Sequence, residues 1–157
     1  YKNRYYFGIF SEDGTKLVGL NSRDLSGKSL IKYRIRGEKK SFVYPLFLNN
    51  EDIIKSGEVY LVEGIGCALK LFSAGIRNVI ILFGCECSWA VVNKLLRLGD
   101  INIFISTDND LAGIEAGKKI YSRLRKYFDS KGLHIKHPIK KDFGDMSIEE
   151  ILEWNKK

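Results

Sequence analysis

The pattern of apolar and polar residues divides the chain into two parts. Along residues 1–50, short apolar runs alternate with polar turns, whereas residues 58–157 repeat a strand followed by a helix. In the first part, apolar runs at 5–10 and 16–20 flank Asp13-Gly14, which predicts a hairpin because Asp-Gly tolerates a positive φ. Residues 30–36 place Ile31, Tyr33 and Ile35 on one side and Lys32, Arg34 and Arg36 on the other, which predicts a strand with a cationic face.

The end of this first part is expected to contain little helix. Residues 42–48 include Pro45 and are predicted to form a strand or an extended segment that ends at Asn49-Asn50. Residues 51–56 are predicted to form one or two helical turns, which Gly57 ends.

The second part predicts a parallel sheet. Strands are expected at 59–62, 79–83, 101–106 and 133–135, and helices at 67–74, 89–98, 111–128 and 147–154. Repeated strand–helix units imply right-handed crossovers and helices on both faces of the sheet. We therefore expect an α/β fold, in which a basic β-rich N-terminal subdomain (residues 1–57) precedes a domain with a mostly parallel sheet (residues 58–157).

Two of the predicted strands end in acidic residues. One strand leads into Glu63-Gly64, and a later one leads into Asp108-Asn109-Asp110. Because the carboxyl ends of parallel strands meet at one edge of the sheet, Glu63, Asp108 and Asp110 are expected to lie together. Carboxylates this close repel one another unless a cation lies between them. Oxygen ligands at an aqueous edge suit Mg²⁺ or Mn²⁺.

The positive charge is concentrated in the first part of the chain. The net charge is +7, and residues 1–57 hold 11 Lys and Arg against 6 Asp and Glu, whereas residues 58–157 hold 15 against 13. Seven of these cations lie between Arg23 and Lys40. Such a cluster is typical of a phosphate-binding surface, although a solvated basic surface has the same composition.

The remaining bulk features narrow the class of protein. The 157 residues suffice for one domain with a small addition, and there is no run of 18 apolar residues that would predict a membrane span. Three cysteines without a C-x-x-C pair predict reduced thiols rather than a zinc site. Because the chain begins with Tyr1 rather than Met, we expect a piece of a longer protein.

The acidic motifs resemble those of the Toprim domain, the α/β module that bacterial and phage primases, topoisomerases and some nucleases share. The family has a strand ending in Glu-Gly and a later strand ending in Asp-x-Asp, often followed by Ala-Gly. Here these are Glu63-Gly64 and Asp108-Asn109-Asp110, with Ala112-Gly113 after them. The resemblance covers roughly residues 58–145.

Further elements resemble the DnaG-like primase branch in order along the chain. They are Gly19 to Asp24 with Arg23, Ile31-Lys32-Tyr33, the segment from Lys39 to Leu46, and Lys140-Lys141-Asp142-Phe143-Gly144-Asp145. The resemblance implies a primase catalytic core fragment that synthesises short RNA primers from ribonucleoside triphosphates on a single-stranded DNA template. It implies Mg²⁺ or Mn²⁺ as cofactor, a replicative helicase acting in cis or in trans, a monomeric fragment, and the cytoplasm of a bacterium or of a phage-infected host.

The resemblance also implies residue roles. Glu63, Asp108 and Asp110 are expected to be catalytic, and the expected metal ligands are Glu63, Asp108, Asp110, Asp142 and Asp145. The expected contacts to nucleotide or nucleic acid are Arg23, Lys32, Tyr33 and Lys39. Tyr33 has the chemistry to stack on a base, and the three cations suit phosphates.

One departure from the family pattern bears on activity. Primases carry an aspartate four residues after the glutamate, and this chain has Cys67 there. A neutral thiol is a poor Mg²⁺ ligand, so one metal position is weakened unless Asp142 and Asp145 compensate. There are two alternatives. One is a Toprim nuclease, but such nucleases lack the basic N-terminal subdomain with Arg23, Lys32 and Lys39, which favours a primase. The other is a non-catalytic Toprim module that binds nucleic acid, for which Cys67 is the main argument.

Overall fold

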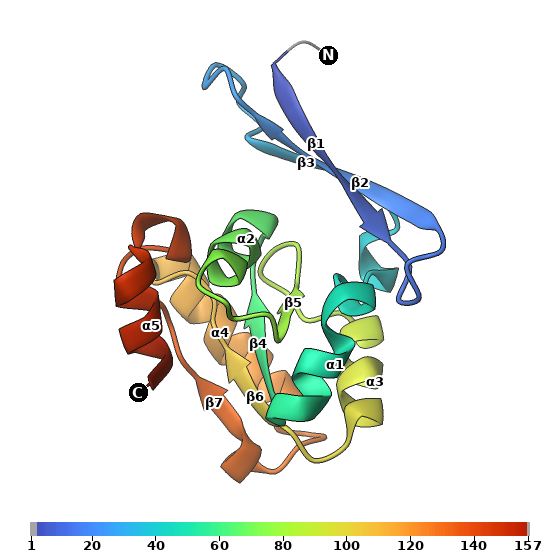
Figure 1. Cartoon of the computed structure of the whole chain (residues 1–157), viewed down its shortest axis with the longest axis vertical. Coiled ribbons are helices and arrows are strands. Elements are labelled where there is room, and N and C mark those ends of the chain that lie inside the picture. Colours follow the sequence, from blue (N-terminus) through green and yellow to red (C-terminus); the bar gives the residue numbers. More distant parts are fainter. Residues whose placement is uncertain (1–2, 157) are drawn as a thin grey trace.

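A three-stranded antiparallel sheet forms the N-terminal part of the structure. The structure is a computed structural model that describes residues 3–156, so Tyr1 lies outside the described residues. The strands are β1 (Arg4–Phe10), β2 (Leu17–Asp24) and β3 (Tyr33–Gly37), in the order β1-β2-β3. This N-terminal sheet stands beside the α/β part, beyond the carboxyl ends of its strands (Figure 1). The predicted hairpin is confirmed, and the third strand is shorter than predicted.

A four-stranded parallel sheet forms the centre of the rest of the chain. Its order is β5-β4-β6-β7, and its strands are β4 (Glu58–Val62), β5 (Val79–Ile81), β6 (Asn102–Ile105) and β7 (Leu133–Ile135). The helices are α1 (Leu46–Ser56), α2 (Ile65–Ser73), α3 (Trp89–Leu98), α4 (Leu111–Leu124) and α5 (Ile148–Lys156). Even α4, with 14 residues, is too short to cross a membrane, and none of the described helices has the length and apolar character for it. The predicted α/β fold class is confirmed.

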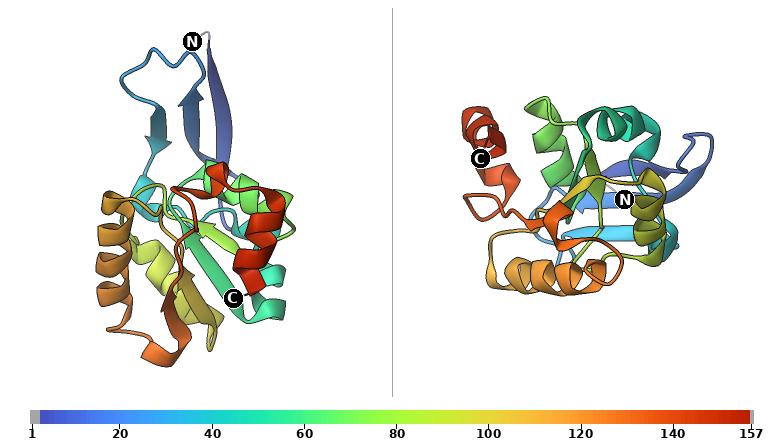
Figure 2. Two further views of the ribbon diagram at one scale, coloured as in Figure 1. Left: turned by 90° about the vertical axis from the view of Figure 1, so that its left-hand side faces the viewer. Right: turned by 90° about the horizontal axis from the view of Figure 1, so that it is seen from below.

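Apolar residues cover both faces of the parallel sheet. In the central strand β4, Val59 and Leu61 point into the cluster formed with α3 and α4, whereas Tyr60 and Val62 point into the cluster formed with α2 and α5. All four side chains are at most 2% exposed. This two-sided burial is what a parallel sheet requires, and Figure 2 shows the helices on either side. The two central strands, β4 and β6, are therefore rigidly held where the acidic motifs begin.

The prediction for residues 42–56 was wrong in one respect. Helix α1 begins at Leu46, five residues earlier than the helical turns expected from 51, and replaces the end of the expected extended segment. Its buried positions are Leu46, Asn49 and Ile53, which have helical spacing, but the middle one is polar. Asn49 is buried because its amide donates to the backbone carbonyls of Arg77 and Val79. The helix was not predicted because the polar Asn49 interrupts the apolar spacing expected along a buried helix face.

The N-terminal sheet touches the parallel-sheet part mainly at one end. Ile9 on β1 is fully buried, and Phe42 is 3% exposed and packs against Phe83 with 5.7 Å between the ring centroids. Gly19 and Gly37 pair with each other across β2 and β3 and lie directly on the Phe42 ring. A Cβ built on Gly19 would lie 2.5 Å from Phe42 Cζ, so the absence of a side chain allows this close approach.

Candidate active site

A cleft of about 730 Å³ lies between the N-terminal sheet and the carboxyl edge of the parallel sheet. One wall comes from β2 and β3, the other from α2, and the floor from the ends of β4 and β6 and the turn near Asp142. Its polar and charged lining residues are Asn21, Arg23, Lys32, Tyr33, Glu63, Cys67, Lys70, Ser73, Asp108, Asp142 and Asp145. The cleft thus joins a wall that carries cations to a floor that carries acids.

Glu63 and Asp108 are adjacent at the floor of the cleft. Glu63 follows β4 and Asp108 lies three residues after the end of β6, and these strands are neighbours in the sheet. The backbone N–H of Asp108 donates to Glu63 Oε1 at 3.2 Å. The Cys67 thiol donates to Asp108 Oδ1 at 3.6 Å, and the Cys85 thiol donates to Glu63 Oε2 at the same distance. Two carboxylates and two thiols therefore share this edge, which the fold brings together from four segments.

The electrostatics of this edge disfavour further negative charge. Burial, together with the charges of Glu63, Asp142 and Asp110, raises the pKa of Asp108 to about 6. Burial and the charges of Asp108 and Asp142 raise the pKa of the Cys67 thiol to about 12, so this side chain is neutral. Burial, followed by the charge of Glu63, also raises the pKa of Cys85. A cation at this edge would offset the part of these pKa shifts that comes from the neighbouring negative charges.

The other expected acids lie in different settings. Asp142 and Asp145 line the cleft from a 3₁₀ turn that Phe143 and Met146 anchor in the core, and Asp142 Oδ1 accepts from the Asp145 N–H at 3.1 Å. Asp110 is not among the residues that line the cleft. Its carboxylate caps α4 by accepting from the Gly113 N–H at 3.0 Å, as Asp commonly does at a helix N-terminus.

The donor chemistry at the floor fits a divalent metal ion in part. Within residues 3–156, no three His, Cys, Asp or Glu side chains lie close enough to hold a metal ion together. Mg²⁺ keeps several of its waters and is commonly bound through one or two carboxylates and the phosphates of a substrate. Glu63 and Asp108 supply such a pair, since the Asp108 backbone N–H lies 3.2 Å from Glu63 Oε1.

The expected cationic and aromatic residues lie on the opposite wall. Arg23 on β2 pairs directly with Tyr33 on β3, and the Arg23 and Lys32 cations lie 5.8 and 5.7 Å from the centre of the Tyr33 ring. Tyr33 is 41% exposed, so its ring is open to a ligand. Lys39 is not among the residues that line the cleft. Its Nζ lies close to Gly84, which does line the cleft, since a Cβ built on Gly84 would lie 2.8 Å from Lys39 Nζ. Three of these four residues therefore line the cleft, and the fourth lies at its rim.

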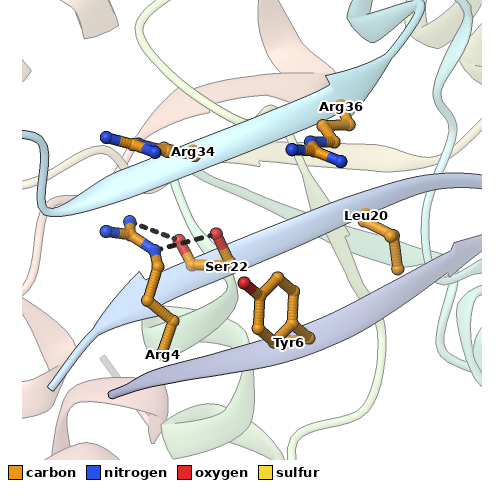
Figure 3. Close-up of a pocket in the computed structure, with 6 residues that line it drawn as sticks. All are labelled: Arg4, Tyr6, Leu20, Ser22, Arg34 and Arg36. Carbon is orange, nitrogen blue, oxygen red and sulfur yellow. Dashed lines mark hydrogen bonds between the residues drawn. The ribbon is translucent and has the colours of Figure 1, made fainter. Parts of the chain in front are cut away.

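The predicted cationic face of β3 looks away from the cleft. Arg34 and Arg36 line a small hollow on the outer side of the N-terminal sheet, beside Arg4 and Tyr6 (Figure 3). Arg4 is held there by Ser22, to which its Nε donates at 3.2 Å. Alternation along β3 therefore separates Arg34 and Arg36 from Tyr33, and Lys32 joins the cleft because it precedes the strand.

Lys70 and Asn21, which line the cleft, and Cys85, which lies beside it, were not singled out from the sequence. Lys70 lies one helical turn after Cys67 on α2, and Cys85 lies in the turn after β5, against Glu63. Asn21 lies two residues before Arg23 on the same face of β2. Helical and strand periodicity would have placed Lys70 and Asn21 on the cleft side once Cys67 and Arg23 were chosen.

The fold and this acidic edge define a mostly parallel α/β domain of the Toprim class with a cationic sheet facing its carboxyl edge. The chain belongs to the Toprim-like family, whose model matches residues 60–147. It is 32% identical over 148 residues to the uncharacterized protein MG010 of Mycoplasma genitalium, which covers 94% of this chain and 67% of that protein. It is 34% identical over 110 residues to a DNA primase of Borreliella burgdorferi, which covers 67% of this chain and 21% of the primase.

A solved primase structure has a similar fold over nearly the whole chain. The DnaG primase catalytic domain bound to single-stranded DNA superimposes with a TM-score of 0.78 and 20% sequence identity, over 98% of this chain and 51% of that one. The chain thus spans about a fifth of the Borreliella primase and about half of the solved domain. It is a primase-like Toprim domain, homologous to primase catalytic domains.

Proposed function

We propose that this chain is the catalytic core of a primase that makes short RNA primers from ribonucleoside triphosphates on single-stranded DNA. The observation that carries the proposal is the single cleft in which Glu63 and Asp108 face Arg23 and Lys32. The primase-like relatives and the DNA carried by a homologous catalytic domain support it. A replicative helicase partner stays a prediction of the sequence resemblance.

In the proposed reaction, the 3′-hydroxyl of the growing primer attacks the α-phosphorus of the incoming nucleotide. The new phosphodiester bond forms as the bond to the leaving pyrophosphate breaks. Glu63 would either bind the metal or take the proton of the hydroxyl, and Arg23 and Lys32, which line the same cleft, would bind phosphates. Tyr33 offers an exposed ring on which a base can stack. Residues 1–57 would then supply the contacts to the nucleotide and residues 58–157 the acids.

A divalent ion would be held by Glu63 and Asp108, with Asp142, Asp145 and Asp110 as further expected ligands or nearby charges. When bound, Mg²⁺ or Mn²⁺ neutralises the charge that builds on the phosphate oxygens. The protein would hold the positive charge of the ion in a fixed position through Glu63 and Asp108. Gly113 keeps the first turn of α4 against the Asp108 backbone, because a Cβ there would collide with the Asp108 carbonyl.

The direct test is primer synthesis by the chain on single-stranded DNA with labelled ribonucleotides and Mn²⁺. We expect short labelled RNA products, and their loss with Asp108→Ala. The same reactions, run with labelled DNA and no nucleotides, would detect the nuclease alternative as shortened DNA. Absence of synthesis under all metal conditions, with DNA left intact, would exclude both catalytic functions for this chain.

Cys67 favours a second candidate, a Toprim module that binds nucleic acid without catalysis. The neutral thiol lies against Asp108 where the family has a carboxylate. A Mn²⁺ titration followed by calorimetry separates the two candidates. A catalytic core binds Mn²⁺ and loses this binding with Asp108→Ala, whereas a non-catalytic module shows neither.

A further inference from the structure

Asn21 is a buried polar residue in the wall of the cleft whose hydrogen bonding is incomplete. It is 4% exposed, lines the cleft, and its Oδ1 has no hydrogen-bond partner. A buried amide oxygen without a donor is costly, so native proteins rarely leave one without a reason. Asn21 lies beside the proposed nucleotide contacts, so a bound nucleotide could provide the missing donor.

The neighbours of Asn21 cannot satisfy it. In the strand register, Asn21 lies between Phe7 on β1 and Ile35 on β3, so the side chains on either side are apolar. One row further along the same face, Arg23 pairs with Tyr33. Tyr33 is therefore a diagonal neighbour of Asn21, at a separation that an aromatic side chain can span. The directly paired side chains offer no donor, and the Asn21 oxygen has no hydrogen-bond partner among the described residues.

The other unpartnered buried atoms in the described part of the chain differ from this one. They are Asn49 Oδ1, Asn50 Oδ1 and Ser106 Oγ, and none of these residues lines the cleft. Asn49 has an evident structural role, because its Nδ2 donates to the carbonyls of Arg77 and Val79. Asn21 alone among the four combines an orphaned acceptor with a place in the cleft wall.

We propose that Asn21 is a specificity-determining residue of the cleft, whose carboxamide oxygen accepts a hydrogen bond from a hydroxyl or amino group of the bound nucleotide. The inference rests on the proposed function, since it requires a nucleotide in the cleft. With the base stacked on Tyr33 and the phosphates near Arg23, either the ribose hydroxyls or the polar edge of the base supplies the donor. Amide side chains read base edges in this way in other protein–nucleic acid contacts.

The test compares Asn21→Leu, Asn21→Ala and wild type in equilibrium binding of the four ribonucleoside triphosphates and the four matching deoxynucleotides, with Mn²⁺ present. Both variants should weaken binding about fivefold to tenfold, which corresponds to one lost hydrogen bond. If the donor is the ribose 2′-hydroxyl, only the ribonucleotides bind more weakly. If the donor is on the base, ribo- and deoxynucleotides weaken alike and the four bases differ.

A stability measurement separates recognition from a structural role. Asn21→Leu replaces an unpartnered amide between Phe7 and Ile35 with an apolar side chain of similar size, so its melting temperature should equal or exceed that of wild type. The matched control is Asn49→Leu, which strands two backbone carbonyls and should lower the melting temperature while the folded protein binds nucleotide normally.

Two outcomes would overturn the inference alone, and a third would overturn the proposed function as well. Wild-type affinity for all eight nucleotides in both Asn21 variants would show that the amide contacts no ligand. A melting temperature that falls in Asn21→Leu as far as in Asn49→Leu would make its role structural. Wild-type protein that binds no nucleotide at all would remove the proposed function together with this inference.

Discussion

The two sheets of this molecule differ in how firmly they are held. In the parallel sheet, four consecutive residues of β4 are buried, and helices cover both faces. In the N-terminal sheet, β1 has a single buried residue, Ile9, and β3 has none. The acidic residues therefore follow strands of a well-buried sheet. The cationic residues lie on a more exposed sheet, one end of which packs on Phe42.

This difference bears on how the cleft would work. The relative position of Glu63 and Asp108 is fixed by neighbouring strands, so the acidic edge is ready before a ligand arrives. The distance from these acids to Arg23 depends on the seat of the N-terminal sheet, which few buried contacts stabilise. Elements with few buried contacts open at lower free energy than the core does. The cationic wall is therefore the part expected to adjust to a ligand.

The largest expected effect comes from truncating the rigid sheet. Leu61→Ala in β4 empties a fully buried position and should cost about 3 kcal/mol of the free energy of unfolding. The matched change Leu17→Ala in β2, where the side chain is 58% exposed, should change it by less than about 0.5 kcal/mol. Urea unfolding of both variants measures the contrast. Equal losses would show that the two sheets do not differ as described.

The second prediction concerns the seat of the N-terminal sheet. In Gly19→Ala the new Cβ would meet the Phe42 ring and, at 2.7 Å, the Arg36 carbonyl oxygen, a backbone atom that cannot move aside easily. We expect a loss of about 1–3 kcal/mol, confined to this sheet. Hydrogen exchange should therefore quicken in β1 to β3 and stay slow in β4 and β6.

The neighbouring change Val18→Ala, at a side chain 39% exposed, is the control for this variant and should leave exchange in all strands nearly unchanged. If exchange in β4 quickens together with that in β2, the two sheets unfold as one unit. The description of a separately seated cationic wall would then be wrong.

The third prediction concerns Cys67, where the resemblance to primases predicts an aspartate. Cys67→Asp places another carboxylate beside Asp108 and Asp142, so without metal the repulsion should lower the melting temperature. With Mn²⁺ the same carboxylate should raise metal affinity about tenfold, and bound metal should return the lost stability. Calorimetric titration and thermal melts, with and without Mn²⁺, measure both parts. Cys67→Asn is the uncharged control, and equal metal affinity in both variants would place Cys67 outside the metal's reach.

The sequence predicted the parallel-sheet part well because its signals are periodic. The helix Trp89–Leu98 and the strand Leu133–Ile135 have the bounds expected from apolar spacing and from Gly99. The helix from Leu46 was missed because Asn49 occupies a buried position that the pattern assumes to be apolar.

At the candidate site, the sequence placed Glu63 and Asp108 at one edge of the sheet, and the structure brings them into contact. It could not tell whether Asp110 faces a ligand or caps a helix, since the same residue type serves both purposes. It also could not show that the Asn21 oxygen lacks a partner, because strand alternation gives the face of a residue and not its hydrogen bonds.

The last prediction tests the two faces of the N-terminal sheet against each other, and it includes the smallest expected effect. Arg23→Ala removes a guanidinium from the cleft wall and should weaken nucleotide binding about tenfold or more, the usual loss for a charged hydrogen bond. Arg34→Ala with Arg36→Ala removes twice the charge, but from the outer face shown in Figure 3. At physiological salt, charges on that face are largely screened from the cleft, so binding should change by less than about twofold. Nucleotide titrations at two salt concentrations measure both effects. If the double variant at Arg34 and Arg36 weakens nucleotide binding as much as Arg23→Ala does, total charge rather than position governs binding. The cleft wall and the outer face of the sheet would then be equivalent in binding.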